Sequence, residues 1–315
     1  MDLIADIGAT NTRCALLDEK GQRVAVEFFK NALFDDLGNL LSHYLERRRV
    51  TDRPKRAALA IAAPIVGGDE IRMTNKDWAF SRAALQKRLG LQRLLVVNDF
   101  AAVAWALPDL GPADLVQVGG GSPSGRAAMA AIGPGSGLGV GAIVPAAEGW
   151  AIVSGEGGHV TLPAADREEQ EVIDILRERY GHCSAERLVC GPGLVTLYGA
   201  LAEMVHKQVP SGLTPPRVSA LAAEGDPLAR KTLSMFFSLL GNVAGNLALT
   251  VGAVGGVFVA GGIVPKLLDE FLRSQFRARF EAKGRYRHYM EKIPTYVITE
   301  PLPAFRGLRR LLGYR

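Results

Sequence analysis

The sequence predicts a soluble α/β protein, and three observations support this. Its 315 residues are 48% apolar and 22% charged, a balance that is typical of globular chains and excludes a disordered one. Short apolar or alternating stretches take turns along the chain with helical patterns. The 36 glycines are concentrated, with 13 in residues 119–158 and 7 in residues 241–262. Such clusters indicate regions where the backbone passes close to other backbone or to a ligand.

The first section of the chain predicts one α/β domain. Strands are expected over residues 3–8, 13–17 and 23–29, separated by turn residues. A helix over 33–48, a strand over 57–62 and a helix over 81–89 follow, with Ser81 as a suitable N-cap. A strand over 94–97 and a helix over 100–107 complete the section. The order βββαβαβα is that of an α/β domain of about 110 residues.

A second section begins near residue 111 and starts with another hairpin. Strands over 129–132 and 140–144 are joined by a glycine loop, which indicates a duplicated core. Further elements are expected as helices over 168–180, 195–206, 228–249, 266–280 and 305–312, and as strands over 257–260 and 296–298. Residues 232–265 carry no charge and could span a membrane by length. Their seven glycines, together with Asn242 and Asn246, predict instead a core helix followed by a buried strand.

Charge and cysteine content narrow the function classes. Residues 271–315 hold 11 Lys or Arg against 3 acids, a charge of +8, so the rest of the +5 chain is −3. We interpret this segment as a solvated surface, because it has no nucleic-acid-binding motif. Cys14, Cys183 and Cys190 lack metal or CxxC spacing and are expected to be reduced thiols. The N-terminus has no signal-peptide pattern.

Two hairpin turns are candidates for phosphate binding. In residues 6–11 the backbone N–H groups and the Thr10 hydroxyl could cradle a phosphate, and Asp6 could hold Mg²⁺ through water. An ordinary turn is the alternative. Residues 133–139 partly match a dinucleotide fingerprint, but a strand is expected where that motif opens a helix. A second phosphate-binding turn, to which Ser136 contributes its hydroxyl, agrees better with this hairpin than the dinucleotide motif does. GxxxxGK[ST], HRD and DFG motifs are absent, which excludes P-loop and protein kinases.

Other motifs are suited to acid–base chemistry and to sugar binding. Asp99 stands where a buried strand meets a helix, so it is either a general base, with a contribution of ~10²–10⁴ in rate, or merely a helix cap. Glu156 and His159, in a glycine-rich loop, could hold sugar hydroxyls or form an exposed turn; a lone His gives no metal site. Glu186 is either a ligand acceptor or a first-turn acid. The glycine pairs at 255–256 and 261–262 suit a flat ring or tight packing.

Taken together and in this order, these motifs resemble those of bacterial glucokinases, in the hexokinase/actin/Hsp70 ATPase superfamily. The resemblance runs from DIGATN, which starts at Asp6, to about residue 300. Its most specific pieces are VNDFAAVAWALP, GEGGHVTLP, SAERLVCGPGLVTLY and GGVFVAGGIVPK. MTNKDWAF at 73–80 is similar to the family's sugar-side loop.

The resemblance implies an α/β, two-domain actin-like ATPase (ribonuclease H-like) fold with an interdomain cleft. The small domain would be 1–109 plus 301–315, and the large domain 110–300. The implied activity is ATP-dependent phosphorylation of D-glucose to glucose 6-phosphate, the first step of glycolysis. Glucose, ATP and Mg²⁺ would be bound, with no nucleic acid or membrane, by a cytoplasmic homodimer.

The resemblance also implies residue roles. Asp99 matches the family's catalytic base. The sugar ligands would be Asn98, Asp99, Glu156, His159 and Glu186. ATP and its phosphates would be bound by Asp6, Ile7, Gly8, Ala9, Thr10, Asn11, Gly135, Ser136, Gly137, Gly261 and Gly262, with Asp6 holding Mg²⁺ through water.

Two departures and three alternatives accompany the resemblance. Ala9 replaces the second glycine of the family's DxGGTN, and its methyl group is expected to crowd the phosphate or stiffen the turn. Residues 304–310 are bulky and basic where the family has small residues, which questions the packing there. The alternatives are a kinase for fructose, mannose or glucosamine, a sugar-sensing regulator on the same scaffold, and an actin-like filament ATPase.

Overall fold

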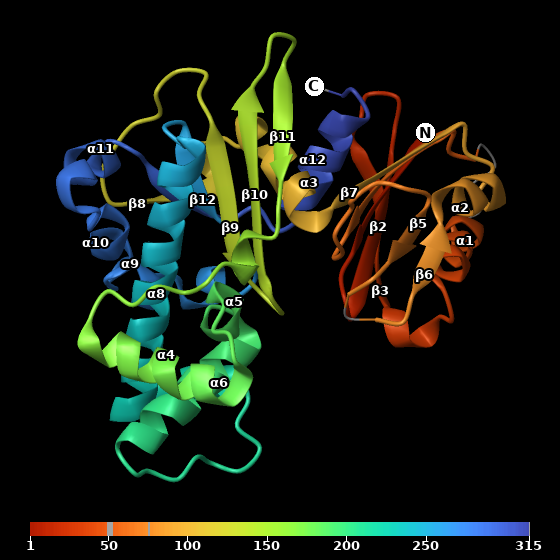
Figure 1. The fold of residues 1–315 in the computed structure, drawn as a ribbon. Coiled ribbons are helices and arrows are strands. Elements are labelled where there is room, and N and C mark those ends of the chain that lie inside the picture. The colour runs from red at the N-terminus through yellow and green to blue at the C-terminus, as the bar shows by residue number, and fades with distance from the viewer. Residues whose placement is uncertain (49–52, 75, 315) are drawn as a thin grey trace. The chain divides into compact units, whose positions relative to one another are not determined.

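A five-stranded sheet organises the first part of the chain in the computed structural model, which describes residues 1–48, 53–74 and 76–314 (Figure 1). Its strands, in the order β3-β2-β1-β4-β7, are β1 (Asp2–Ile7), β2 (Asn11–Leu17), β3 (Arg23–Lys30), β4 (Arg56–Ile61) and β7 (Arg93–Asn98). β1, β2 and β3 form the predicted antiparallel meander. β4 runs parallel to β1, and β7 runs parallel to β4. Parallel neighbours need crossover connections, and helices provide them here.

The helices of this part begin at side-chain caps. α1 (Leu37–Arg47) starts four residues later than predicted, because residues 31–33 form a 3₁₀ turn and Asp36 is the N-cap. α2 (Arg82–Arg88) has the predicted cap, with Ser81 Oγ accepting from the N–H of Ala84 at 3.0 Å. α3 (Asp99–Ala106) follows β7 directly. A small hairpin of β5 (Glu70–Arg72) and β6 (Ala79–Ser81) was not predicted.

A six-stranded sheet repeats this pattern in the second part. Its strands, in the order β11-β10-β9-β12-β13-β8, are β8 (Leu115–Val118), β9 (Met129–Pro134), β10 (Leu138–Pro145), β11 (Trp150–Ser154), β12 (Gly256–Val259) and β13 (Thr295–Ile298). β9 and β10 form a hairpin, β12 runs parallel to β9, and β13 runs parallel to β12. This is the arrangement of β1, β2, β4 and β7, in agreement with the predicted duplicated core. The short edge strands β8 and β11 were not predicted.

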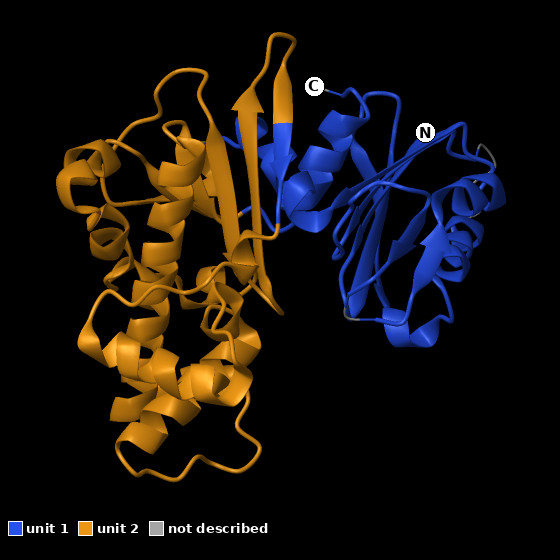
Figure 2. Ribbon diagram, in the orientation of Figure 1, with its two compact units in different colours: residues 1–111, 152–155, 300–315 blue, residues 112–151, 156–299 orange. Residues whose placement is uncertain are grey.

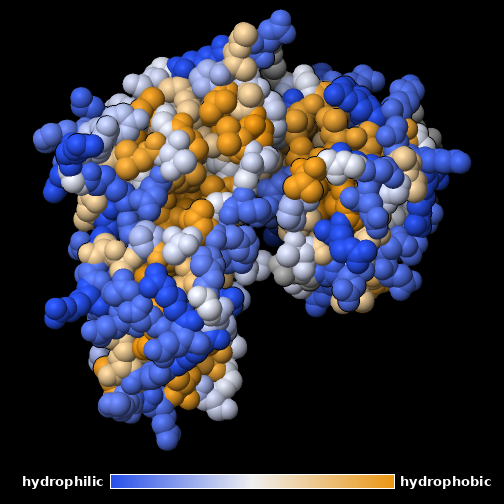
Figure 3. Space-filling view, in the orientation of Figure 1, coloured by the Kyte–Doolittle hydropathy of each residue, from blue (hydrophilic) through white to orange (hydrophobic). Residues whose placement is uncertain are grey.

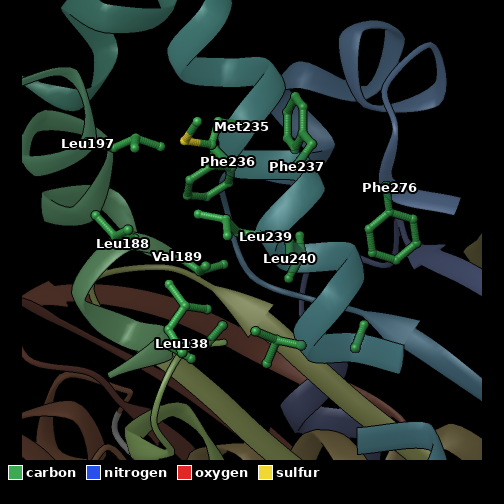
Figure 4. Close-up of a cluster of buried hydrophobic side chains, with 14 of the residues drawn as sticks. Leu138, Leu188, Val189, Leu197, Met235, Phe236, Phe237, Leu239, Leu240 and Phe276 are labelled. Carbon is green, nitrogen blue, oxygen red and sulfur yellow. The ribbon is translucent and has the colours of Figure 1, made fainter. Parts of the chain in front are cut away.

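The remaining helices form most of the second part. They are α4 (Arg167–Tyr180), α5 (Ala185–Leu188), α6 (Gly191–Met204), α7 (Pro215–Glu224), α8 (Pro227–Val251), α9 (Leu268–Leu272), α10 (Phe276–Glu281) and α11 (Arg287–Glu291). The surface around α4 is mostly hydrophilic in Figure 3, and Figure 4 shows the apolar side chains that α8 places in the interior. The single helix predicted over 266–280 is instead α9 and α10. Between them the Ser274 hydroxyl donates to the carbonyl oxygen of Phe271 at 2.6 Å and accepts from the Phe276 N–H at 3.2 Å, which interrupts the helix.

α8 is a core helix, as predicted. Among the described residues it is the one helix that is long and apolar enough to cross a membrane. Of an apolar stretch of 18 residues within it, 61% is buried inside the protein. Gly241 and Gly245 face α10 at close range. A Cβ atom at Gly241 would overlap the carbonyl oxygen of Phe276, and one at Gly245 would lie 2.7 Å from that of Phe280. The two glycines therefore allow α8 and α10 to pack closely.

The basic segment 271–315 is built into the fold rather than being only a solvated surface. Arg277 donates to the carbonyl oxygens of Ile293 and Glu291 at 2.8 and 3.1 Å. Lys283 Nζ donates to the Oδ1 atoms of Asn242 and Asn246 at 2.6 and 2.7 Å. Burial, together with a nearby guanidinium, lowers the pKa of Lys283 to about 8. These cations link the segment to α8 and to neighbouring backbone.

The bulky residues near the C-terminus form a helix, α12 (Pro303–Leu311), that packs on α3. Phe305 and Leu308 are fully buried. Gly307 allows the contact, because a Cβ atom there would overlap the carbonyl oxygen of Ala102. The departure from the small-residue pattern therefore does not disturb packing at this place: an amphipathic helix supports the element that carries Asp99.

The described residues divide into two compact units (Figure 2). The first comprises Met1–Gly111, Ile152–Gly155 and Glu300–Arg315, and the second comprises Pro112–Ala151 and Glu156–Thr299. The sequence-based division into 1–109 plus 301–315 and 110–300 does not separate Ile152–Gly155 from the large domain. Long-range contacts decide which unit these four residues join, and local sequence patterns carry no information on them.

Candidate active site

The first predicted phosphate turn is held by a buried amide. The N–H of Gly8 donates to the carbonyl oxygen of Asn11 at 3.0 Å and closes the turn between β1 and β2. Asn31, which is 1% exposed, donates from Nδ2 to the carbonyl oxygen of Gly8 at 2.8 Å. Its Oδ1 accepts from the Thr12 hydroxyl at 2.8 Å. No sequence pattern indicates this role of Asn31, because an asparagine after a strand has the same local pattern as any turn residue.

Ala9 causes no backbone strain in this turn. Among the described residues other than glycine, only Ala25 and His206 have a positive φ. Ala9 therefore adopts a conformation that is open to any L-residue, and the turn does not need the freedom of glycine at this position. Thr10 and Asn11 are exposed beside it. Crowding of a phosphate by the methyl group stays a prediction.

Asp6 pairs with a cation across the hairpin. Its Oδ2 accepts from Arg13 Nη1 at 2.7 Å, and the two residues are register partners in β1 and β2. Burial raises the pKa of Asp6, and the Arg13 guanidinium opposes this shift. The described residues contain no group of three or more His, Cys, Asp or Glu that could hold a metal ion. A single carboxylate fits Mg²⁺ that keeps most of its waters and binds chiefly through phosphates.

Asn98 rather than Asp99 is the cap of α3. Asn98 Oδ1 accepts from the N–H groups of Phe100 and Ala101 at 2.9 and 3.2 Å. Its Nδ2 donates to the carbonyl oxygen of Ala63 at 3.2 Å. Asp99 is the half-buried first residue of the helix, and its Oδ1 also accepts from the Phe100 N–H, at 2.9 Å. The interpretation of Asp99 as the N-cap is therefore wrong.

The first turn and Asp99 lie at the same edge of one sheet. Ile7 is paired with Ile61, and Ile61 is paired with Asn98, so β1, β4 and β7 end level with one another. In α/β folds, ligands bind beyond the carboxyl ends of parallel strands. A candidate general base and a candidate phosphate turn, eighty-eight positions apart in sequence (99 − 11), are thus presented at one edge.

The second glycine turn is also a hairpin between strands. The N–H of Gly135 donates to the carbonyl oxygen of Gly137 at 2.7 Å, and the N–H of Gly191 donates to that of Gly135 at 2.8 Å. β10 begins at Leu138, so a strand follows the glycines, as predicted, and a dinucleotide fingerprint is excluded. Ser136 lies at the tip, between the two glycines.

The predicted sugar loop is packed against this hairpin. Gly157–His159 form one 3₁₀ turn after β11, and the N–H of His159 donates to the carbonyl oxygen of Glu156 at 2.9 Å. A Cβ atom at Gly158 would overlap the carbonyl oxygen of Leu138. His159 Nε2 lies 3.8 Å from Glu186 Oε1, so the structure brings these two predicted sugar ligands together.

Glu186 does more than favour a helix dipole. It lies in the first turn of α5, whose cap is Ser184. Its carboxylate nevertheless binds to another element, because Oε2 accepts from the N–H of Leu138 at 2.8 Å. The dipole interpretation is therefore incomplete, because this carboxylate also binds another element.

The glycine pair at 261–262 combines tight packing with open space. Gly261 has φ +85°, and a Cβ atom there would overlap the carbonyl oxygen of Pro134. A Cβ atom at Gly262 would meet nothing within 4 Å. Gly261 is thus required by the close approach of backbone, whereas Gly262 borders open space. The alternative of tight packing holds for Gly261.

Comparison with known proteins decides the family. A model of the glucokinase family matches residues 3–313. The chain belongs to the glucokinase family. It is 45% identical to a glucokinase of Paramagnetospirillum magneticum over 315 residues, which cover 99% of this chain and 97% of the relative. It is 43% identical to the bifunctional protein glk of Paraburkholderia xenovorans, where 99% of the chain matches 48% of the relative. The chain thus spans about half the length of that bifunctional relative.

Solved structures agree with this assignment. A glucokinase from an Antarctic psychrotroph superimposes with a TM-score of 0.87 at 34% identity, covering 100% of this chain and 99% of the other. A ROK family glucokinase from Streptomyces griseus, solved with glucose and AMPPNP, gives a TM-score of 0.65 at 17% identity, covering 98% of each chain, and shows the fold alone. These findings confirm the predicted glucokinase family and the predicted two-domain actin-like α/β fold class.

Proposed function

We propose that the chain transfers the γ-phosphoryl group of ATP to the 6-hydroxyl group of D-glucose, with the Asp99 carboxylate as general base. The observation that carries this proposal is the level ending of β1, β4 and β7. Asn98 caps α3, so the fold does not depend on Asp99 for that task. A carboxylate at the start of this helix can accept the proton of a sugar hydroxyl as it attacks the phosphorus atom.

The sugar ligands in this proposal suit a neutral polyol. Asn98, Glu156, His159 and Glu186 offer carboxylate, amide and imidazole groups, which accept from and donate to hydroxyls. His159 and Glu186 lie within 3.8 Å of each other, which supports a shared ligand. Fructose, mannose and glucosamine present similar hydroxyls, and the geometry of the pocket decides among them.

ATP would be bound by backbone and hydroxyl donors from both hairpins. Its phosphates would be held by Ile7, Gly8, Ala9, Thr10 and Asn11 on one hairpin and by Gly135, Ser136 and Gly137 on the other, with Gly261 and Gly262 near the adenosine. Backbone N–H groups in such turns favour anions, and because those of Gly8 and Gly135 already donate within their turns, the other donors of the two hairpins would meet the phosphates. Mg²⁺, when bound, would supply positive charge to the transferring phosphate, and Asp6 would hold it through water.

We also propose a cytoplasmic location and a homodimeric state. Cys14, Cys183 and Cys190 are buried and free, which supports a reducing compartment such as the cytoplasm. Homodimer formation is carried over from the resemblance to the family and is testable by light scattering.

The test is a coupled assay of ADP release with a panel of hexoses. We expect glucose to give the highest kcat/KM, and Asp99→Ala to lower kcat by about 10²–10⁴. Asp35→Asn, which changes an exposed acid of the same unit, is the matched control and keeps its activity. Absence of ADP with glucose, or full activity in Asp99→Ala, would overturn the assignment.

A further inference from the structure

One carboxylate of the second unit contacts both the phosphate hairpin and the sugar loop. Glu186 Oε2 accepts from the N–H of Leu138, the residue that follows the turn, at 2.8 Å. Glu186 Oε1 lies 3.8 Å from Nε2 of His159. The two oxygens of one side chain therefore address two different parts of the candidate site.

The hairpin is shaped to receive this carboxylate. A Cβ atom at Gly137 would overlap Glu186 Oε2, so only glycine leaves the position of the oxygen free. Gly137 has no positive φ, and its backbone conformation alone does not demand glycine. The space beside Gly137 is thus used by the carboxylate.

The elements on both sides of the contact share one core. Leu138 is 4% exposed and Leu188, in the helix of Glu186, is fully buried. Both belong to the buried hydrophobic cluster drawn in Figure 4. The N–H of Ala185 donates to the carbonyl oxygen of Val160 at 2.9 Å, which ties the same helix to the sugar loop. The carboxylate is therefore supported by a packed frame.

We propose that Glu186 is a positioning residue for the phosphate hairpin, in addition to its role as a sugar ligand. This rests on the proposed function, because it takes residues 135–137 as a phosphate site. A hydrogen bond from a backbone N–H to a carboxylate is stronger than one between neutral groups, and it holds the turn in one conformation before nucleotide arrives. A sugar hydroxyl bound to the other oxygen fixes the same side chain, so the two ligands favour each other's binding reciprocally.

The test measures nucleotide binding with no sugar present, using AMPPNP and isothermal titration calorimetry. We expect Glu186→Ala to weaken AMPPNP binding about tenfold, because the Leu138 N–H loses its partner. Glu156→Ala is the matched control: it removes another acid of the sugar side, keeps the bond to Leu138 and leaves AMPPNP binding within about twofold of wild type. A residue that acts only on sugar cannot produce this difference.

Glu186→Gln is the rescue variant. Its amide oxygen can still accept from the Leu138 N–H, so AMPPNP affinity returns to within about threefold of wild type while the charge that faces the sugar is lost. If Glu186→Ala does not fold, Glu186→Asp, which is one methylene shorter, replaces it. Unchanged AMPPNP affinity in the Ala or Asp variant, an equal loss in Glu156→Ala, or no rescue by Gln would overturn the proposal.

Failure of the proposed activity can be distinguished from failure of the positioning role of Glu186. If the wild-type protein binds AMPPNP but no hexose of the panel causes ADP release, the proposed activity fails. The positioning role of Glu186 is then still decided by AMPPNP binding to the variants. If wild type does not bind AMPPNP, both proposals fail.

Discussion

The two glycine hairpins, residues 6–11 of the first unit and residues 133–139 of the second, occupy the same place in their sheets but are held in different ways. The first is fixed by a neutral amide, because Asn31 donates to the carbonyl oxygen of Gly8. The second is fixed by a charged group, because Glu186 accepts from the N–H of Leu138. Asn31 donates hydrogen bonds to backbone carbonyl oxygens, whereas Glu186 accepts one from a backbone N–H.

This difference explains where glycine is needed. Ala9 sits in the first turn without a positive φ, although the related motif has glycine at that position. Gly137 in the second turn has a carboxylate oxygen where a Cβ atom would lie. A glycine is indispensable where another atom occupies the space of a side chain, and replaceable where the backbone is ordinary and open. Three substitutions, from the largest expected effect to the smallest, would break or sharpen this comparison.

Gly137→Ala is expected to have the largest effect. The methyl group displaces the Glu186 carboxylate, which costs the hydrogen bond to Leu138 and moves a sugar ligand, so kcat/KM for both ATP and glucose falls about tenfold or more. The displaced atom is the end of a flexible side chain, and Tm therefore changes by only about 2 °C. Steady-state kinetics and thermal unfolding measure the two effects.

The controls for Gly137→Ala are two other glycines of the same region. A methyl group at Gly135 meets only the carbonyl oxygen of Gly137, at 3.9 Å, so Gly135→Ala should disturb activity less. At Gly158 the obstacle is backbone of Leu138, and Gly158→Ala should lower Tm as well as activity. Equal effects on activity at 135 and 137 would contradict the role given to the carboxylate.

Asn31→Ala is expected to have an intermediate effect. It removes the donor to the first turn and leaves the buried Thr12 hydroxyl without its acceptor, which should cost about 1–3 kcal/mol of stability. KM for ATP should rise several-fold, because the turn loses the hydrogen bond from Asn31 to Gly8. Denaturant unfolding measures the loss of stability, and steady-state kinetics with ATP measures the change in KM.

Thr12→Val separates the effect on stability from the effect on KM for ATP. It removes the hydroxyl that donates to Asn31 Oδ1 but keeps the bond from Asn31 to Gly8. Stability should therefore fall while KM for ATP stays near that of wild type. A rise of KM in Thr12→Val as large as that in Asn31→Ala would show that general destabilisation, rather than the turn, is responsible.

Ala9→Gly is expected to have the smallest effect. Removing the methyl group should lower KM for ATP by no more than about twofold, because the turn is unstrained already. Added freedom in the unfolded chain should lower stability by about 0.4–1 kcal/mol. An unchanged KM would mean that the methyl group does not crowd the phosphate.

Local patterns predicted most elements but not the bonds between them. The meander, the cap at Ser81, the hairpin at 133–139 and the core helix α8 follow from residue periodicity and turn chemistry. The break at Ser274 was missed, because one side-chain bond outweighs a helical pattern. Asn31 and Arg13, which support the first turn, carry no local signal that separates them from ordinary polar residues.

The sequence by itself determined the order of most strands and helices, the glycine-rich turns and, through several motifs together, the glucokinase resemblance that comparison then confirmed. Only the tertiary structure decided that Asn98 caps α3 in place of Asp99, that the basic C-terminal segment has partners within the fold, and that Glu186 reaches Leu138. Turns and periodicity depend on neighbours a few residues apart. These other features depend on atoms that come together from distant parts of the chain, such as residues 138 and 186, once the core has packed.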